Sequence, residues 1–222
     1  VDEYLEQTAI ANPHARIEYR PPTGEEILFD RAVDELPPDT EEIKPHPMGI
    51  ELGTLIQMLE RTSATQLGAF FKQEFCRVGP TSAKEICRRA GLSDRTWIKQ
   101  VGHAEAERLY AAIQEVRVPA PPTSCVQAIG TKTLLSGLLK EVRGEFYAAS
   151  TRPPSVYRGR PFIIEAAIAY GGDLPGDEPS RIIRFANRVP LQYQQSACSS
   201  FKAVLETNWR NYGLTQPRGG VP

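Results

Sequence analysis

The chain has 222 residues, of which 41% are hydrophobic, so it can build one large domain or two modest ones, each with its own core. No stretch approaches the ~20 consecutive apolar residues that a membrane-spanning helix needs, and no charged and then apolar leader opens the chain. The net charge of −1 favours no class of partner by itself. The first residue is Val1 and the last residues have turn composition, so we expect both ends to be internal to a longer protein.

The charge is unevenly distributed along the chain. Residues 1–51 hold 4 Lys or Arg against 13 Asp or Glu, whereas residues 52–118 hold 10 against 7 and residues 119–222 hold 12 against 7. An acidic first part is therefore followed by two basic blocks. We expect a polyanionic partner to meet the later two-thirds of the chain.

The cysteine spacing argues against a zinc site. No CxxC pair occurs among the four cysteines, and only three histidines could complete a ligand set. We expect reduced, mostly buried thiols in a cytoplasmic protein. The four are Cys76, Cys87, Cys125 and Cys198.

The first part of the chain has the pattern of a helix followed by two strands. Apolar residues at helical spacing predict a helix over 1–11, and an Asn-Pro pair ends it because proline disfavours helical geometry in the residue before it. Alternation of apolar and charged residues predicts a strand over 15–19. After a predicted turn at 22–24, a second strand is expected to start at 27–29.

A proline-rich, acidic linker leads from this part to a helical module. Residues 34–49 carry few apolar side chains, which predicts a stiff, extended connection. From 50 to 116 apolar residues recur at helical spacing, which predicts a compact module of about four helices. The four apolar stripes are Leu52, Leu55, Ile56 and Leu59; Leu67, Phe70, Phe71 and Phe75; Ile86, Cys87 and Ala90; and Ala106, Leu109, Tyr110 and Ile113.

The last hundred residues mix helical and strand-like patterns. A proline-rich boundary at 119–122 precedes a predicted helix over 130–142. Three strand-like runs separated by turn-forming residues and one last helix follow, which indicates an α+β or mixed fold. These runs and the helix are 146–151, 162–170, 181–193 and 195–206.

A glycine turn that leads into a helix is the strongest local signal. Within 78–92, Gly79 turns the chain, and Ser82 and Glu85 have the spacing of a capping box. Gly91 can adopt the left-handed conformation that follows many helices. The unpaired N–H groups and the dipole of a helix N-terminus favour a phosphate.

Four cations are the candidates for such a phosphate contact. Lys84 and Arg88 share one helical face at i and i+4, Arg89 lies beside them, and Lys99 follows in the next polar segment. The spacing fits an ordinary capped helix with solvated bases equally well.

A second candidate site combines an aromatic pair with a cation. Trp209 and Arg210 are adjacent and Tyr212 follows, so these side chains could stack on and pair with a nucleic-acid backbone. The competing interpretation is a helix end whose aromatic side chains pack into the core. No Walker A, GxGxxG, GxSxG or HExxH pattern occurs, so the chain by itself is not expected to make or break bonds.

Ordered phrases along nearly the whole chain resemble the B subunit of type IIB DNA topoisomerases, the topoisomerase VI family. The phrases are TAIANPHARIEY (8–19), EEIKPHPMGIELGTL (41–55), QEFCRVGPTSAKEICRRAGL (73–92), APPTSCVQAIG (120–130), TRPPSVYRGRPFIIEAAIAYGG (151–172), RFANRVPLQY (184–193) and NWRNYGL (208–214). Chance agreement of all of them is very improbable, because several are long and specific.

The resemblance implies three structural parts. Residues 1–47 resemble the C-terminal end of a GHKL (Bergerat) ATPase domain with a linker, residues 48–118 a helix-two-turn-helix domain, and residues 119–222 the N-terminal part of a transducer domain. In this archaeal-type family, two B subunits dimerise on ATP and Mg²⁺. They drive one DNA duplex through a double-strand break that two A subunits make. The implied partners are thus the topoisomerase VI A subunit, a second B subunit, and double-stranded DNA, with no membrane, in the cytoplasm near the nucleoid.

The resemblance carries over only one set of site residues. A tryptophan-lysine-x-tyrosine run that contacts DNA in the family falls on Trp209, Arg210 and Tyr212, and arginine in place of lysine keeps the charge but changes the geometry. The ATP-binding residues of the family are expected before Val1 and after Pro222. No catalytic, ATP-binding or metal residue is therefore expected in this chain.

Two other functions compete with a segment of an ATP-hydrolysing topoisomerase. One is a B-like scaffold that has lost its nucleotide site and only positions a DNA-cleaving partner. The other is a free-standing helix-two-turn-helix adaptor that binds nucleic acid, which the flanking phrases make improbable.

Overall fold

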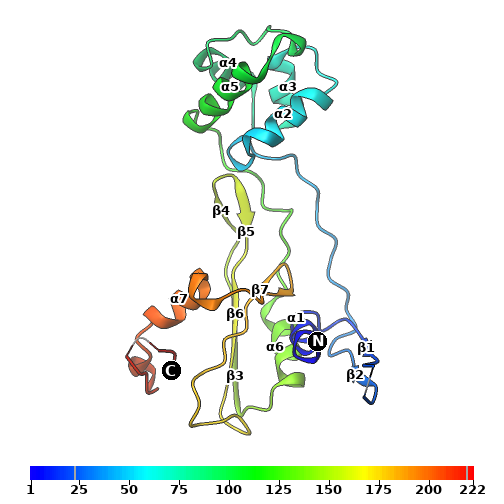
Figure 1. Cartoon of the computed structure of the whole chain (residues 1–222), viewed down its shortest axis with the longest axis vertical. Helices are drawn as coiled ribbons and strands as arrows, with labels where there is room; N and C mark the ends of the chain where they lie inside the picture. Colours follow the sequence, from blue (N-terminus) through cyan, green and yellow to red (C-terminus); the bar gives the residue numbers. More distant parts are fainter. Residues whose placement is uncertain (23, 219) are drawn as a thin grey trace. The chain divides into compact units, whose positions relative to one another are not determined.

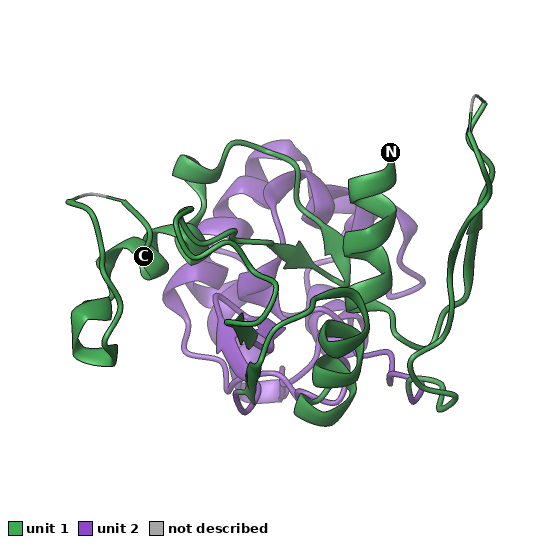
Figure 2. Cartoon of the chain, turned by 90° about the horizontal axis from the view of Figure 1, so that it is seen from below, with its two compact units in different colours: residues 1–37, 129–151, 165–222 green, residues 38–128, 152–164 purple. Residues whose placement is uncertain are grey.

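The computed structural model describes residues 1–22, 24–218 and 220–222. Its chain forms two compact units, which Figure 2 colours separately. Unit 1 comprises residues 1–37, 129–151 and 165–222, and unit 2 comprises residues 38–128 and 152–164. Among the described residues, no helix combines the length and the apolar character needed to cross a bilayer.

The N-terminal part of unit 1 is the predicted helix and hairpin. Helix α1 (Asp2–Ala11) ends at Asn12, whose backbone N–H and side-chain amide both donate to the Thr8 carbonyl. Strand β1 (Ile17–Tyr19) pairs antiparallel with β2 (Ile27–Phe29). Both predictions are confirmed, and the predicted turn between the strands includes residue 23, which lies outside the described residues.

The centre of unit 1 is one helix packed on a two-stranded sheet. Helix α6 (Thr131–Glu141) contacts α1 and both strands of the pair β3 (Phe146–Thr151) and β6 (Glu165–Tyr170). The Glu165 carboxylate accepts the N–H groups of Ile129 and Gly130, both at 2.8 Å, and so holds the residues just before α6 against β6. The helix and β3 agree with the predictions, whereas the predicted strand over 162–170 starts only at Glu165.

The C-terminal part of unit 1 contains less strand than the sequence predicts. Only β7 (Phe185–Ala186) and β8 (Val189–Pro190) form within 181–193. Asn187 and Arg188 have φ angles of 51° and 64°, so they make a tight turn that interrupts the predicted strand. The short helix η3 (Gln195–Ala197), helix α7 (Ser199–Glu206) and the short helix η4 (Trp209–Tyr212) follow.

Unit 2 contains the predicted four-helix module. The helices are α2 (Leu52–Arg61), α3 (Leu67–Glu74), α4 (Pro80–Arg89) and α5 (His103–Glu115), with the short helices η1 (Pro47–Gly49) and η2 (Ile98–Gln100) (Figure 1). Gly91 follows α4 with a φ of 69°, and the Leu92 N–H donates to the Cys87 carbonyl at 2.9 Å. The predicted left-handed end of this helix is therefore confirmed.

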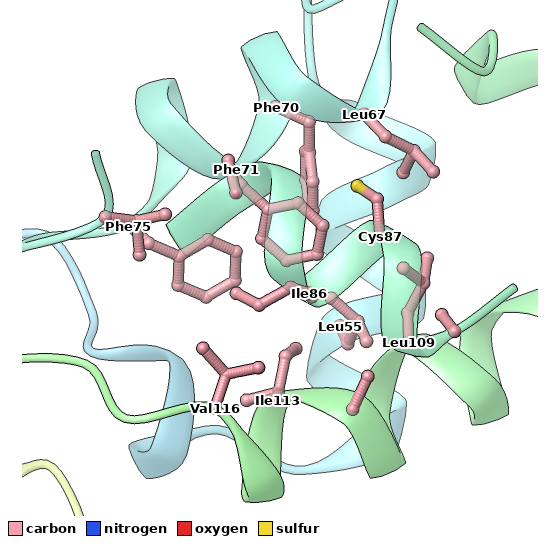
Figure 3. Close-up of a cluster of buried hydrophobic side chains, with 14 of the residues drawn as sticks. Leu55, Leu67, Phe70, Phe71, Phe75, Ile86, Cys87, Leu109, Ile113 and Val116 are labelled. Carbon is pink, nitrogen blue, oxygen red and sulfur yellow. The ribbon is translucent and has the colours of Figure 1, made fainter. Parts of the chain in front are cut away.

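The apolar stripes of these helices meet in one core (Figure 3). Three phenylalanine rings lie at its centre, with centroids 5.2 to 5.8 Å apart. Such aromatic contacts add to the free energy gained by burying the rings. The predicted stripe Leu67, Phe70, Phe71 and Phe75 is buried in full, as are Leu55, Ile86, Leu109 and Ile113.

A second element of unit 2 is the hairpin formed by β4 (Ser155–Tyr157) and β5 (Arg160–Phe162). Arg158 and Gly159 connect the strands with φ angles of 47° and 72°, which is the geometry of a two-residue hairpin turn. This pairing takes Phe162 out of the long strand that the sequence predicts over 162–170. The fold is mixed α and β, with seven α-helices and four two-stranded antiparallel sheets among the described residues.

Candidate nucleic-acid interface

Helix α4 begins at the predicted glycine turn, but its cap differs from the prediction. Gly79 is the N-cap in an extended conformation and Pro80 occupies the first turn; among the described residues no side chain caps this end. Ser82 therefore lies inside the helix, and the predicted Ser82–Glu85 capping box is wrong. Proline starts the helix earlier because its φ is preset and its missing N–H needs no partner. The N–H groups of the first turn remain available to an anion.

The arginines of α4 are compensated by carboxylates. Arg88 donates to the two oxygens of Glu85 at 2.7 and 2.8 Å, and Arg89 donates to Glu85 at 2.8 Å and to Glu115 at 3.0 Å. These hydrogen bonds, that of Arg88 first, lower the pKa of the Glu85 carboxyl to about 2. The sequence predicts that Lys84 and Arg88 share one face of this helix. Both are exposed, but among the described residues only Arg88 forms an ion pair.

The segment that carries Lys99 also presents an aromatic side chain that sequence reasoning missed. Lys99 lies in η2 and is exposed, and Trp97 just before it is 54% exposed. The Leu67 N–H donates to the Thr96 carbonyl at 3.0 Å, so the backbone that carries this ring is held on α3. An exposed tryptophan between Arg95 and Lys99 suits stacking on a nucleic-acid base or sugar. Its alternation with two cations in a polar loop is the sequence signal that could have identified it.

The C-terminal trio has two roles. The indole N–H of Trp209 donates to the Val204 carbonyl at 2.7 Å, and the half-buried ring lies 6.0 Å from that of Tyr212. Trp209 therefore closes the end of α7, but neither aromatic side chain is buried in a core as the competing interpretation expects. Arg210 and Tyr212 are exposed, the latter by 72%, so they are the members of the trio that a polyanion can reach.

The structure brings the predicted site residues together in two groups, one in each unit. Unit 2 carries Lys84, Arg88, Arg89 and Lys99, and unit 1 carries Trp209, Arg210 and Tyr212. Lys84, Arg88 and Arg89 lie on α4, Lys99 lies in η2, and the trio lies in η4.

Two hollows on the described residues are poorly suited to a nucleotide. One of about 610 Å³ in unit 1 is lined by Asp2, Glu3, Glu6 and Glu141 with Arg181 as its single cation, so its net negative charge would repel a triphosphate. A hollow of about 440 Å³ in unit 2 lies along α2 and has no glycine-rich loop to cradle phosphates. In the part of the chain that the structure describes, no three His, Cys, Asp or Glu side chains could hold a metal ion together.

The four cysteines are free, and two of them differ strongly in ionisation. Burial raises the pKa of the Cys87 thiol to about 12. A hydrogen bond from Tyr193, the N–H of Phe201 and the Arg184 guanidinium lower the pKa of the Cys198 thiol to about 6. Cys198 lies at the N-terminus of α7, where backbone N–H groups favour the thiolate.

Comparison with known proteins assigns the family of this sequence. Residues 121–221 match the family described as "Topoisomerase VI B subunit, transducer". The B subunit of type 2 DNA topoisomerase 6 from Methanosarcina acetivorans is 50% identical over 220 residues, which are 99% of this chain and 35% of that protein. Its namesake from Archaeoglobus fulgidus is 42% identical over 222 residues, 100% of this chain and 37% of that protein. The Metallosphaera sedula protein of the same name is 32% identical over 218 residues, 96% of this chain and 41% of that protein. This chain spans 35 to 41% of the length of these three relatives.

Proposed function

Since this chain belongs to the family of topoisomerase VI B subunits, we propose that it forms the middle of an ATP-binding B subunit. In this proposal it contacts the DNA duplex and transmits the nucleotide state of its own subunit to the DNA-cleaving A subunit. The observation that carries the proposal is similarity along 96 to 100% of the chain to proteins named as DNA topoisomerase subunits.

Within the subunit, each part of the chain has its own proposed role. Residues 1–47 form the C-terminal end of a GHKL ATPase domain and a linker, and residues 48–118 form a helix-two-turn-helix domain. Residues 119–222 form the N-terminal part of the transducer. The four-helix core of unit 2 and the helix packed on β3 and β6 support the second and third assignments.

The proposed reaction is the passage of one duplex through a break in another. Two B subunits and two A subunits form the active assembly, which relaxes and decatenates DNA in the cytoplasm near the nucleoid. In this proposal ATP and Mg²⁺ bind to other parts of the subunit, as the family resemblance implies. The residues of this chain supply rigid units and cationic surfaces, and the A subunit cleaves the DNA.

DNA contact by this chain is supported by exposed cations and aromatics without carboxylate partners. Lys84, Lys99, Arg210 and Tyr212 meet this description. Arg88 and Arg89 contribute less, because Glu85 already compensates them.

The test is a relaxation assay with the complete subunit that contains this chain, purified together with its A subunit. Supercoiled plasmid should be relaxed with ATP and Mg²⁺ and should remain supercoiled when either is left out. Binding of the A subunit without ATP hydrolysis would instead identify a scaffold. If the purified protein bound neither DNA nor its cleaving partner, the proposal would be wrong.

A further inference from the structure

A buried histidine joins three segments of unit 2 that lie far apart in the sequence. A side-chain carbon at Gly159, in the hairpin turn, would lie only 2.4 Å from His46 Nδ1, so the ring and the hairpin are in close contact. Arg160 Nε donates to the Gly49 carbonyl at 3.0 Å, and His46 Nε2 lies 3.0 Å from the Pro119 carbonyl oxygen. The hairpin β4–β5 is thereby fixed beside the segment that leads into α2 (Figure 1).

Exposed cations gather along the chain around this junction. Arg158 and Arg160 flank Gly159 on the hairpin, and Arg117 lies two residues before Pro119. The Cys76 N–H donates to the Pro45 carbonyl at 3.0 Å, so Arg77, which follows Cys76, and Lys44, which precedes Pro45, lie near the same junction. We call the surface formed by Tyr157 and these five cations the junction surface. The cations are Lys44, Arg77, Arg117, Arg158 and Arg160.

The charge of the junction surface is not compensated. Within the described parts of the chain, none of its five cations forms an ion pair, whereas Arg88 and Arg89 of α4 do. Three carboxylates, Glu42, Glu51 and the half-buried Glu74, lie within three residues of the junction along the chain, so an excess of two positive charges remains. Unpaired and solvent-exposed cations are the groups that exchange counterions for phosphates.

One aromatic side chain of the junction surface is also exposed. Tyr157 is 65% exposed, and the Arg158 guanidinium carbon lies 5.5 Å from the centre of its ring. The ring limits the freedom of the guanidinium and leaves its N–H groups open to an acceptor. Because the hairpin turn is fixed on His46, this pair is presented on a rigid support.

We propose that the junction surface binds the phosphate backbone of duplex DNA without reading its sequence. The proposal rests on the proposed function, which makes duplex DNA the polyanion that this subunit meets. Arginines that can donate two N–H groups to one phosphate suit this ligand, and their contacts position a duplex without specifying its bases. An acidic protein surface is the competing ligand, and the test below separates the two.

The test measures the salt dependence of DNA binding by the complete subunit, with a fluorescent duplex of random sequence as the probe. The junction variant combines Arg77→Asn, Arg117→Gln and Arg158→Asn. Asparagine tolerates the φ angles of 59° and 47° at its two positions, so both turns are preserved. The matched control combines Arg61→Gln, Lys72→Gln and Arg152→Gln, which removes three exposed cations of the same unit that form no ion pair among the described residues.

Each lost phosphate contact lowers the slope of log affinity against log salt by about 0.9, so the junction variant should lose about 2.7. Affinity at fixed salt should fall at least tenfold, while the control keeps the wild-type slope within about one contact. The single variant Arg117→Gln, with an expected loss of about 0.9, provides the answer if the triple variant does not fold.

Equal slopes for the junction variant and the control would overturn the inference and leave the proposed function intact. Normal DNA binding with lost binding of the A subunit would also overturn it, in favour of an acidic protein surface. A wild-type subunit that binds no DNA would instead refute the proposed function, and the inference with it.

Discussion

Replacing Gly159 with alanine should separate the hairpin β4–β5 from His46 and leave the helical core of unit 2 folded. The φ of 72° already costs a residue with a side chain roughly 1–2 kcal/mol. The added carbon would lie 2.4 Å from His46 Nδ1 and 3.0 Å from the Gly49 N, neither of which can move while the ring stays buried. Undocking avoids these overlaps but loses the Arg160–Gly49 hydrogen bond, which contributes about 0.5–1.5 kcal/mol. The expected total is about 1.5–3.5 kcal/mol.

The pKa of His46 is the assay, because the chain has only three histidines and their NMR signals can be assigned by substitution. Burial lowers this pKa, although the hydrogen bond to Pro119 opposes the effect. Undocking gives the ring access to water, so the pKa should rise towards the ordinary value of about 6.5.

The matched control is Gly91→Ala, at a φ of 69° in the same unit. Its added carbon would lie 3.4 Å from the flexible end of Arg108, so it carries the backbone cost of roughly 1 kcal/mol without a rigid overlap. The pKa of His46 should stay low in this variant. An unchanged pKa of His46 in Gly159→Ala would show that the hairpin is not what buries the ring, and the reasoning would fail.

Three further predictions concern ionisation and the C-terminal aromatics. The pKa of folded His46 lies below the unfolded value of about 6.5, so the neutral ring contributes fully to stability above that pH. This contribution is lost as the pH falls towards the folded pKa. In thermal melts between about pH 7 and 5, the melting temperature of His46→Gln should therefore depend less on pH than that of the wild type. Trp209→Phe should lower the unfolding free energy by about 1 kcal/mol, because the indole hydrogen bond is lost. Tyr212→Ala should weaken DNA binding without changing the melting temperature. The opposite pattern would contradict the roles assigned to the two side chains. The Cys198 thiol should ionise with a midpoint near pH 6, measured by the ultraviolet absorbance of the thiolate in a variant that keeps only this cysteine. Cys87 kept alone should remain protonated well above neutral pH, and equal midpoints for the two thiols would count against the two environments.

Periodic patterns in the sequence are enough to predict the helices and the core of unit 2. The apolar residues from Leu67 to Phe75 have helical spacing and so lie on one face of the helix. This face is buried when it packs against the other helices. The left-handed Gly91 is equally readable, because few residues other than glycine accept that conformation and the helix before it is well marked. The family could be inferred as well, because ordered phrases along the chain are matched by proteins that are up to 50% identical.

Tertiary structure decided what each charged or aromatic side chain contacts. Glu85 has the spacing of a capping residue, yet it pairs with Arg88 and Arg89, because Pro80 starts the helix a turn earlier. Trp209 belongs to a run that is typical of a nucleic-acid contact, yet its indole N–H donates a hydrogen bond to the Val204 carbonyl of the same chain. Residues close in sequence compete for the same partners, and local spacing alone does not identify which partner prevails.

Strand pairing and long-range contact also lie beyond the sequence. Phe162 begins the strand that the sequence predicts over 162–170, but a tight turn at Arg158 and Gly159 pairs it with β4 instead. The phrases around His46 and Gly159 are separated by more than a hundred residues, and nothing in either predicts that the imidazole packs on the glycine. The amino-acid sequence therefore determined the helices, the apolar core and the family of this protein, because these follow from periodicity and from ordered phrases. Only the folded chain decided which cations stay unpaired, because that depends on the carboxylates that folding brings within reach.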